Sequence, residues 1–369
     1  MEAAPLFSAP LVKSYSMKLE KLKLTNFRNL NNLSLEFEDL NVIVGPNASG
    51  KSSVLEAIVF ACTGKSIRAD HDREVIKRGK DHARIYSEIT RDGEKTKLEI
   101  IVIPSERFES GSKKQVKLNG VSKTLNTFAG SLVSVIFTPN DLEIVNDGPQ
   151  IRRKYLDSIF LQTSKEYRTA HTNLIKVIRH RNKLLERIRD FGTGKGELQY
   201  WNDKLTEVSH TIHKYRKDFF EFSKDPFLAY GKTLNGKSSE LTHKYKPSLV
   251  TEERLKEYES AEIASKSTLI GPNRDDFSVS LDGLDLETYG SRGQQRMSVL
   301  ALKLCEIDYI ATKVHARPLL LLDDIFSELD DAHKKHVFDI VSLQQTIITA
   351  TDISALKAEL KSFKTMELP

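Results

Sequence analysis

The stretch NVIVGPNASGKSSVLEAI, residues 41–58, decides the fold of this chain. Its first residues, NVIV, are typical of a buried strand, and its last residues begin an apolar helix. Between them, GPNASGKS matches the pattern G-x-x-x-x-G-K-[ST], in which backbone N–H groups, a helix dipole and a lysine together form a site for phosphate. A strand before this turn and a helix after it predict a nucleotide-binding loop in an α/β protein.

The same pattern occurs a second time, as GKTLNGKS at residues 231–238. SKDPFLAY precedes this second match and SELTHKYKP follows it, and neither is typical of a buried strand or a long apolar helix. We therefore interpret it as a loop that fits the pattern by chance.

A carboxylate partner for the first loop is expected in PLLLLDD, residues 318–324. Four consecutive leucines are typical of a central parallel strand, although an acidic helix cap after a core strand would look similar. We expect Lys51 to reach the β- and γ-phosphates of ATP, Ser52 to ligate Mg²⁺, and Asp323 to orient the water shell of that metal. Asp324 would polarise the attacking water. The phosphates are expected to contact Gly45, Pro46, Asn47, Ala48, Ser49, Gly50, Lys51, Ser52 and Ser53.

Composition excludes several classes of protein. The chain has 369 residues, 39% of them hydrophobic and 29% charged, and no apolar run approaches the roughly 18 residues that span a membrane. Cys62 and Cys305 are far apart in apolar stretches, as expected for core residues of a reduced, cytoplasmic protein. Residues 1–16 lack a basic start and contain two prolines, so we expect a flexible extension and no targeting signal.

Positive charge is concentrated in one part of the chain. Residues 150–224 contain 17 Lys and Arg against 9 Asp and Glu, whereas the whole chain has a net charge of only +5. Such a segment is typical of a nucleic-acid contact, and a solvated helical surface is an equal alternative. The candidates for DNA contacts are Arg152, Arg153, Lys176, Arg179, Arg181 and Lys183.

The order of patterns predicts an interrupted domain. Strand patterns dominate residues 17–149, helical periodicity with a GTGKG break dominates residues 150–266, and strands return in residues 267–369. We therefore expect one α/β domain made of 17–149 and 267–369, with a helical arm inserted as residues 150–266.

YGSRGQQR, residues 289–296, resembles the signature motif of ABC-type ATPases. In that superfamily the start of a helix forms a second phosphate cradle, which closes over the nucleotide of another subunit. SELDDAH, residues 327–333, resembles the D-loop that follows the paired aspartates. The resemblance assigns Ser291, Arg292, Gly293, Gln294 and Gln295 to the signature in trans, and Ser327 and Asp330 to the D-loop.

The 240 residues between Lys51 and Ser291 point to the SMC/Rad50-like branch, in which a helical segment is inserted at this place. Within that branch the chain is similar to the RecF family along nearly all of residues 17–369. The similar stretches are LTNFRNL, NVIVGPNASGKSSVLEAI, GKSIRADHDREVIKRG, TPNDLEIVNDGPQIRRKYLD, GPNRDDF, SRGQQR and LLLLDDIFSELD. The implied fold is an ABC-type ATPase head, a P-loop NTPase, with an inserted helical arm.

Several positions depart from the superfamily pattern. Asp324 stands where a catalytic glutamate is common, which RecF proteins share, and slow hydrolysis is expected. Thr351 stands where a histidine is frequent, and Asn273 replaces the histidine of GPHRDD. Arg28 matches an arginine that approaches the nucleotide in Rad50-like proteins, with a surface salt bridge as the alternative, and Asn140 falls where a glutamine is usual. The resemblance thus makes Arg28, Asn140 and Thr351 candidates for nucleotide contacts.

The resemblance implies a function in bacterial DNA repair and replication. It implies an ATP-dependent homodimer that binds duplex DNA near gaps or junctions, slow Mg²⁺-dependent hydrolysis that releases it, and RecR, with or without RecO, as partner in RecA loading and the SOS response. Three alternatives stay open: an architectural SMC/Rad50-like clamp, the energising subunit of an ABC transporter, and an ATPase of the defence type that works with a nuclease.

Overall fold

The computed structural model describes residues 17–106, 111–236, 238–327, 334, 337–338, 341–353, 356, 360 and 362–368. The chain divides into two compact units, Met1–Asp141 with Glu306–Pro369, and Leu142–Cys305. The assignment of residues 150–266 to a distinct arm stays a prediction.

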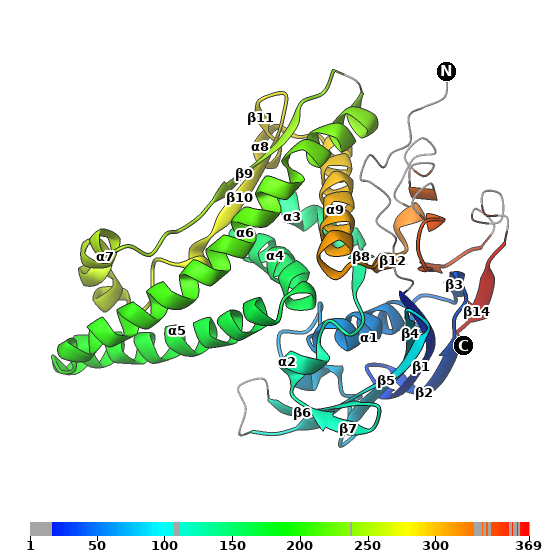
Figure 1. Ribbon diagram of the computed structural model, residues 1–369, viewed down its shortest axis with the longest axis horizontal. Helices are drawn as coiled ribbons and strands as arrows, with labels where there is room; N and C mark the ends of the chain where they lie inside the picture. Colours follow the sequence, from blue (N-terminus) through cyan, green and yellow to red (C-terminus); the bar gives the residue numbers. More distant parts are fainter. Residues whose placement is uncertain are drawn as a thin grey trace. The chain divides into compact units, whose positions relative to one another are not determined.

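An antiparallel sheet forms one layer of the first unit (Figure 1). Its strand order is β2-β1-β4-β5-β6-β7, and apolar residues alternate with polar ones, as in β1, where Leu22 and Leu24 are buried and Lys23 is exposed. One face of this sheet therefore packs inside the unit. The strands are β1 (Met17–Phe27), β2 (Leu30–Glu36), β4 (Ala83–Arg91), β5 (Glu94–Pro104), β6 (Ser112–Leu118) and β7 (Val121–Lys123).

A second sheet of the first unit is parallel, in the order β14-β3-β13-β12-β8. The four leucines of β12 are at most 1% exposed because β8 and β13 flank the strand on both sides. All carboxyl ends of a parallel sheet lie at one edge, so this sheet gathers the segments that follow its strands. The strands are β3 (Leu40–Val44), β8 (Ser134–Phe137), β12 (Leu319–Asp323), β13 (Thr346–Ala350) and β14 (Lys364–Glu367).

Helix α1 (Lys51–Thr63) contacts strands of both sheets, β1, β4 and β5 of the antiparallel one and β8, β12 and β13 of the parallel one. Every residue of α1 except Ser52 is buried, as expected for a helix that is apolar on all sides. Gly64 ends the helix in the left-handed conformation, with φ at 70°. The short elements of this unit are η1 (Asp72–Val75), α2 (Leu125–Phe128), η2 (Pro139–Leu142) and η5 (Ile325–Ser327).

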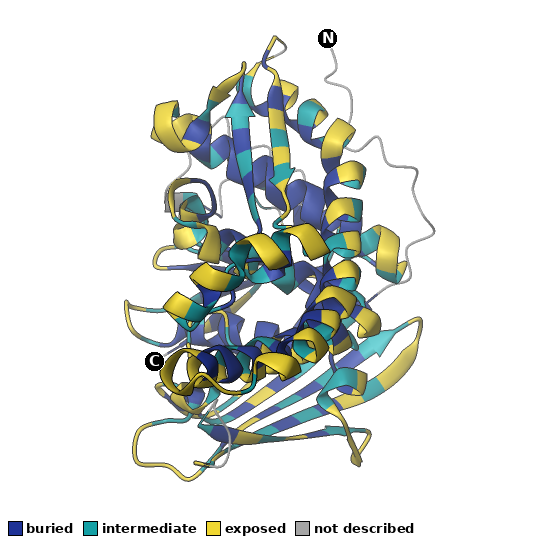
Figure 2. Cartoon of the chain, turned by 90° about the vertical axis from the view of Figure 1, so that its left-hand side faces the viewer, coloured by how far each residue is buried: buried dark blue, intermediate teal, exposed yellow. Residues whose placement is uncertain are grey.

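The second unit is built on the long helices α5 (Lys165–Phe191) and α6 (Leu198–Asn235), which pack along each other. Each shows buried residues along one side and exposed residues along the other (Figure 2). The helical periodicity that begins at Pro149 does not form one continuous helix: it breaks at Ser164, whose hydroxyl accepts the N–H of Tyr167 and caps α5.

A three-stranded sheet, in the order β11-β10-β9, belongs to the second unit. Strand β9 lies within residues 150–266, where the sequence predicted helices only. The boundary between the units falls inside α9. Residues 330–343, DDAHKKHVFDIVSL, have a helical pattern in the sequence, and they lie largely outside the described ranges. The remaining elements are α3 (Glu143–Asn146), α4 (Pro149–Thr163), η3 (Lys195–Glu197), β9 (Leu241–Lys246), α7 (Glu252–Ser265), η4 (Pro272–Arg274), β10 (Asp276–Leu281), β11 (Leu284–Asp285), α8 (Leu286–Tyr289) and α9 (Arg292–Val314).

The first five residues of the second pattern match, GKTLN, lie in a helix and not in the loop that the sequence predicted. Gly231 to Asn235 are the last residues of α6, and a Cβ on Gly231 would lie 2.4 Å from the Cβ of Leu241. This glycine therefore allows β9 to pack against α6. Among the helices of the described ranges, none combines the length and apolarity that crossing a bilayer requires.

Candidate functional site

The loop of residues 45–50 joins β3 to α1. Ala48 and Gly50 have φ values of 66° and 106°, and a Cβ on Gly50 would lie 2.6 Å from the Leu30 side chain. The Nζ of Lys51 donates to the carbonyls of Gly45, at 2.5 Å, and Pro46, at 3.0 Å. The lysine is thereby held across the loop, beside the first N–H groups of a buried helix, which is an arrangement suited to an anion.

The hydroxyl of Ser52 donates to Oδ1 of Asp323 at 2.9 Å. This contact joins the start of α1 to the end of β12. A hydroxyl and a carboxylate are oxygen ligands of the kind that Mg²⁺ takes together with water and phosphate oxygens. The pair that the sequence predicted for the metal is therefore brought together, and its donor atoms fit Mg²⁺.

Asp324 follows directly and has a left-handed backbone, with φ at 52°. Its N–H donates to Oγ1 of Thr349, at 3.1 Å, and to the Thr349 carbonyl, at 3.3 Å. A non-glycine residue in this region is strained, and such strain gathers at functional sites. Thr349 itself was missed from the sequence, because a threonine in the strand TIITA reads as an ordinary β-branched residue.

Three other candidates follow strands of the same parallel sheet. Asn140 lies in η2 after β8, Thr351 comes directly after β13, and both are exposed. Ser327 ends η5, shortly after β12, whereas Asp330 lies outside the described residues. The register of β8, β12, β13 and β3 puts their carboxyl ends at one edge, so Asn140 and Thr351 belong to the same edge as the loop.

Arg28 has its guanidinium engaged within the first unit. Its Nε and Nη2 donate to Oε2 and Oε1 of Glu56, and Nη1 donates to the Glu74 carbonyl. The side chain of Glu56 is fully buried in α1, and that of Arg28 is 24% exposed. Arg28 therefore compensates a buried charge one and a half turns beyond Lys51, and its role toward the nucleotide stays a prediction.

Asn29 is a residue that the sequence analysis missed. Its amide donates to the carbonyl of Ala48 at 2.9 Å, and its Oδ1 accepts the hydroxyl proton of Ser53 at 3.0 Å. It thus links the turn after β1 to the phosphate loop and to the first turn of α1. Its place next to Arg28, in LTNFRNL, was the available signal.

The signature candidate lies in the second unit, where α9 begins. The N–H of Ser291 donates to Oε1 of Gln294, at 2.9 Å, and the N–H of Gln294 donates to the Ser291 hydroxyl, at 3.3 Å. This reciprocal pair is a capping box. Arg292 and Gly293 are exposed, and the buried Gln295 donates to the Leu286 carbonyl. The exposed residues 291–294 therefore present the start of a long helix to solvent.

The six basic candidates for DNA contacts differ in their burial and in their partners. Arg152 forms ion pairs with Asp276 and Glu287, and the fully buried Arg181 pairs with Glu262 on α7. These two guanidinium groups hold the second unit together and do not face solvent. Arg153 is partly buried and donates to the Asp275 carbonyl. Lys176 and Lys183 are exposed, and Arg179 is partly exposed, on α5.

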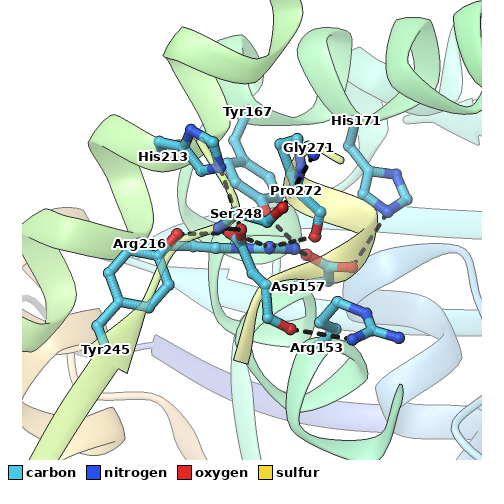
Figure 3. A network of polar contacts seen from close by, with 11 residues as sticks. Arg153, Asp157, Tyr167, His171, His213, Arg216, Tyr245, Ser248, Gly271 and Pro272 are labelled. Carbon is cyan, nitrogen blue, oxygen red and sulfur yellow. Dashed lines mark hydrogen bonds and ion pairs between the residues drawn. The ribbon is translucent and has the colours of Figure 1, made fainter. Parts of the chain in front are cut away.

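GPNRDD forms the η4 turn, beside a buried polar network (Figure 3). The fully buried Asp275 accepts hydrogen bonds from Arg216, His213, Tyr245 and the N–H of Ser248. Asn273, in place of the family's histidine, donates to the Thr268 carbonyl.

The same arginine, Arg216, also pairs with Asp157, which accepts the hydroxyl of Tyr167 and faces His171. Burial works to raise the pKa of Asp157, but the charge of Arg216 and the contact with His171 outweigh it and hold that pKa below its ordinary value. Asp275 is shifted in the same direction, since His213 and Arg216 outweigh burial. Both carboxylates are therefore kept ionised, and the network ties α4, α5, α6, β9 and η4 to one another.

Comparison with known proteins identifies the relatives of this chain. The family model for the RecF/RecN/SMC N terminal domain matches residues 18–366. The DNA replication and repair protein RecF of Lachnoclostridium phytofermentans is 35% identical, over 91% of this chain and 93% of its own. RecF of Alkaliphilus oremlandii is 33% identical, over 92% of this chain and 95% of its own.

Solved structures agree with these relatives. A structure of the recombination mediator protein RecF-ATP in the RecFOR pathway is 30% identical, with a TM-score of 0.86 and 96% of both chains covered. The Smc head domain of Pyrococcus furiosus, bound to the C-terminal domain of ScpA, has a TM-score of 0.53 at 17% identity, covers 96% of this chain and 94% of its own, and bears on the fold alone. The expected fold class, an α/β ABC-type ATPase head of the SMC-like branch, is confirmed.

Proposed function

Because the chain belongs to the RecF family of DNA replication and repair proteins, we propose that it is an ATP-dependent, DNA-binding recombination mediator of the bacterial cytoplasm. The observation that carries the ATP-dependent part of this proposal is the hydrogen bond of 2.9 Å between Ser52 and Asp323. It brings the two candidate metal ligands together at the edge of the sheet where the phosphate loop lies.

ATP would be held by residues 45–53, with Lys51 turned from the carbonyls of the loop toward the β- and γ-phosphates. Ser52 and Asp323 would hold Mg²⁺, which would supply positive charge against the charge that develops on the phosphates. Asp324 would orient the attacking water. Its side chain is one methylene shorter than the glutamate common in the superfamily, which supports slow hydrolysis.

The nucleotide would also join two copies of the chain. The start of α9, where residues 291–294 are exposed, suits the γ-phosphate held by another subunit, with Ser291 and Gly293 facing Lys51 and Ser52 of the partner copy. Contacts that only the dimer makes would then favour the dimer in proportion to ATP occupancy.

The proposed ligand of this dimer is DNA, and slow ATP hydrolysis would release the DNA. The proposed target is duplex DNA near single-strand gaps or junctions, contacted in part by the solvent-facing cations of α5. RecR, with or without RecO, would be the partner that leads to RecA loading and the SOS response. Family membership supports these partners, whereas the geometry of the chain supports the proposed binding of ATP.

Light scattering with and without ATP and duplex DNA tests the dimer. The wild type should double its mass with ATP, whereas Ser291→Arg should stay monomeric because a bulky side chain occupies the start of α9. Lys51→Ala is the matched control in which nucleotide binding itself is lost. A wild type that stays monomeric with ATP, or a Ser291→Arg variant that dimerises equally well, would contradict the proposal.

A further inference from the structure

Thr349 lies where the two aspartates of β12 meet the neighbouring strand. It is 1% exposed, and it pairs in register with Asp323 on one side and with Ile43 of β3 on the other. Such a central position in a parallel sheet normally holds an apolar side chain. The role of a hydroxyl at this buried position can therefore be inferred from its hydrogen-bond partners.

The Thr349 hydroxyl has polar partners on three consecutive residues. Oγ1 is 2.8 Å from Oδ1 of Asp323 and 3.4 Å from the Leu322 carbonyl, and it accepts the N–H of Asp324 at 3.1 Å. A hydroxyl has one proton to donate and two lone pairs to accept with. The shorter distance assigns the proton to the Asp323 carboxylate, which leaves a lone pair for the Asp324 N–H.

Two hydroxyls therefore converge on one carboxylate oxygen. Ser52 and Thr349 both donate to Oδ1 of Asp323, at 2.9 and 2.8 Å. Ser52 is itself expected to ligate the metal, so its contact with Asp323 changes with the state of the site. The contact from Thr349 comes from a residue that is 1% exposed and that is not itself an expected metal ligand.

The contact with Asp324 concerns the backbone. In a strand, successive side chains point to opposite faces, but Asp324 leaves this alternation through its left-handed φ of 52°. Its N–H is shared between the hydroxyl and the carbonyl of Thr349. One residue of β13 thus holds the carboxylate of Asp323 and the backbone of Asp324 together.

We propose that Thr349 is a positioning residue for ATP hydrolysis, which orients the metal-associated carboxylate of Asp323 and fixes the backbone from which Asp324 faces the attacking water. This inference rests on the proposed function. It predicts that the hydroxyl of Thr349 matters for the metal and for turnover, and little for the binding of the nucleotide by residues 45–53.

Thr349→Val and Thr349→Ser test the inference, because valine keeps the shape without the hydroxyl and serine keeps the hydroxyl. Steady-state hydrolysis is measured against ATP and against Mg²⁺. Groups that orient a metal ligand are typically worth about 10–100-fold in metal affinity or activity. We expect Thr349→Val to lower kcat by at least about tenfold, to move the Mg²⁺ midpoint upward, and to leave the KM for ATP within about threefold of wild type. Thr349→Ser should restore the Mg²⁺ midpoint.

If Thr349 had only a structural role, its folded variants would keep the wild-type Mg²⁺ midpoint. Thermal melting is therefore recorded to establish that each variant is folded. A folded Thr349→Val with the wild-type midpoint and kcat would overturn the inference, as would a Thr349→Ser that fails as badly as valine. If Thr349→Val does not fold, Thr349→Cys takes its place, since a thiol donates weakly and must shift the midpoint in the same direction. If the wild type hydrolyses no ATP, the proposed function fails, and the two failures are thereby distinguished.

Discussion

The guanidinium of Arg28 meets the carboxylate of Glu56 at two points, with Nε 2.9 Å from Oε2 and Nη2 2.6 Å from Oε1. The Ser66 hydroxyl donates to Oε1 as well. Because the Glu56 side chain is fully buried, these partners supply the hydrogen bonds that water cannot give it. The arginine that resembles a nucleotide contact is therefore also a structural residue, and the two roles can be separated.

Replacing Arg28 alone should destabilise the protein. Arg28→Met leaves an uncompensated buried carboxylate, which typically costs about 3–5 kcal/mol in the free energy of unfolding. Arg28→Met with Glu56→Met removes both charges and should recover most of that loss, as urea unfolding would show. The ATP affinity of the double variant then tests the second role. This affinity is lower than that of wild type if Arg28 contacts the nucleotide, and it equals that of wild type if the arginine only stabilises Glu56.

Asn29→Ala should weaken ATP binding without unfolding the protein. Two hydrogen bonds to the phosphate loop and α1 are lost, each with a net value of about 0.5–1.5 kcal/mol, so affinity should fall roughly tenfold. Isothermal titration with ATP measures the change. Asn32→Ala, at an exposed position of β2, is the matched control. Equal ATP affinities of the Asn29→Ala and Asn32→Ala variants would show that Asn29 does not support the phosphate loop.

Gln294→Glu should separate the helix cap from the proposed dimer contact. Glutamate at this position keeps the capping box with Ser291 and suits the start of a helix, so thermal stability should be unchanged or higher. A negative charge at the surface that is proposed to face phosphate should nevertheless reduce ATP-dependent dimerisation, measured by light scattering. Undiminished dimerisation would place the partner's phosphate elsewhere.

The buried polar network predicts loss of stability in acid. Asp157 and Asp275 have folded pKa values held below the ordinary value of about 3.9, so their contribution is present above that pH and is lost as the pH falls toward the folded pKa values. Urea midpoints should therefore decline below roughly pH 4. Asp157→Asn should lower stability at pH 7 and flatten this decline.

Glu221→Gln is the control for that series, because Glu221 lies in an exposed pair with Lys217 on α6. Exposed pairs contribute about 0–1 kcal/mol, so its pH profile should follow wild type. If Asp157→Asn follows the wild-type profile too, Asp157 is not a source of the acid sensitivity.

Neutralising Lys176, Arg179 and Lys183 together should lower the salt dependence of DNA binding. The slope of log K against log salt concentration should fall by roughly 2–3 if all three contact phosphates. Lys217→Gln, at an exposed lysine of α6, gives the single-charge control. An unchanged slope would move the DNA site off this part of α5.

The sequence predicted the part of the fold that is local in the chain. The strand, the loop and the helix over residues 41–58 are continuous in the sequence, and the four leucines of PLLLLDD indicate a buried strand. The sequence therefore predicted β3, α1 and β12. Pairing across long distances leaves no such trace. Nothing in residues 364–367 shows that they pair with β3, and Thr349 gains its meaning only from Asp323, 26 residues earlier.

Charge was the least informative part of the pattern. Arg181 and Lys183 read alike in a basic helical segment, but Arg181 lies inside against Glu262, Asn202 and Thr268, and Lys183 faces solvent. The partner of a buried arginine comes from another element, 81 residues away in the case of Glu262. A count of charges along one helix therefore overestimates the cations that are available to DNA.

The neighbours of β3 determine when its loop can take shape during synthesis. β3 is made early, but both strands that pair with it, β13 and β14, come from residues 346–367. During translation, β3 has no partner strand at either edge until some 300 further residues have been made. Unpaired strand edges of this kind favour aggregation. We therefore expect that shielding of this strand on the nascent chain raises the yield of folded protein.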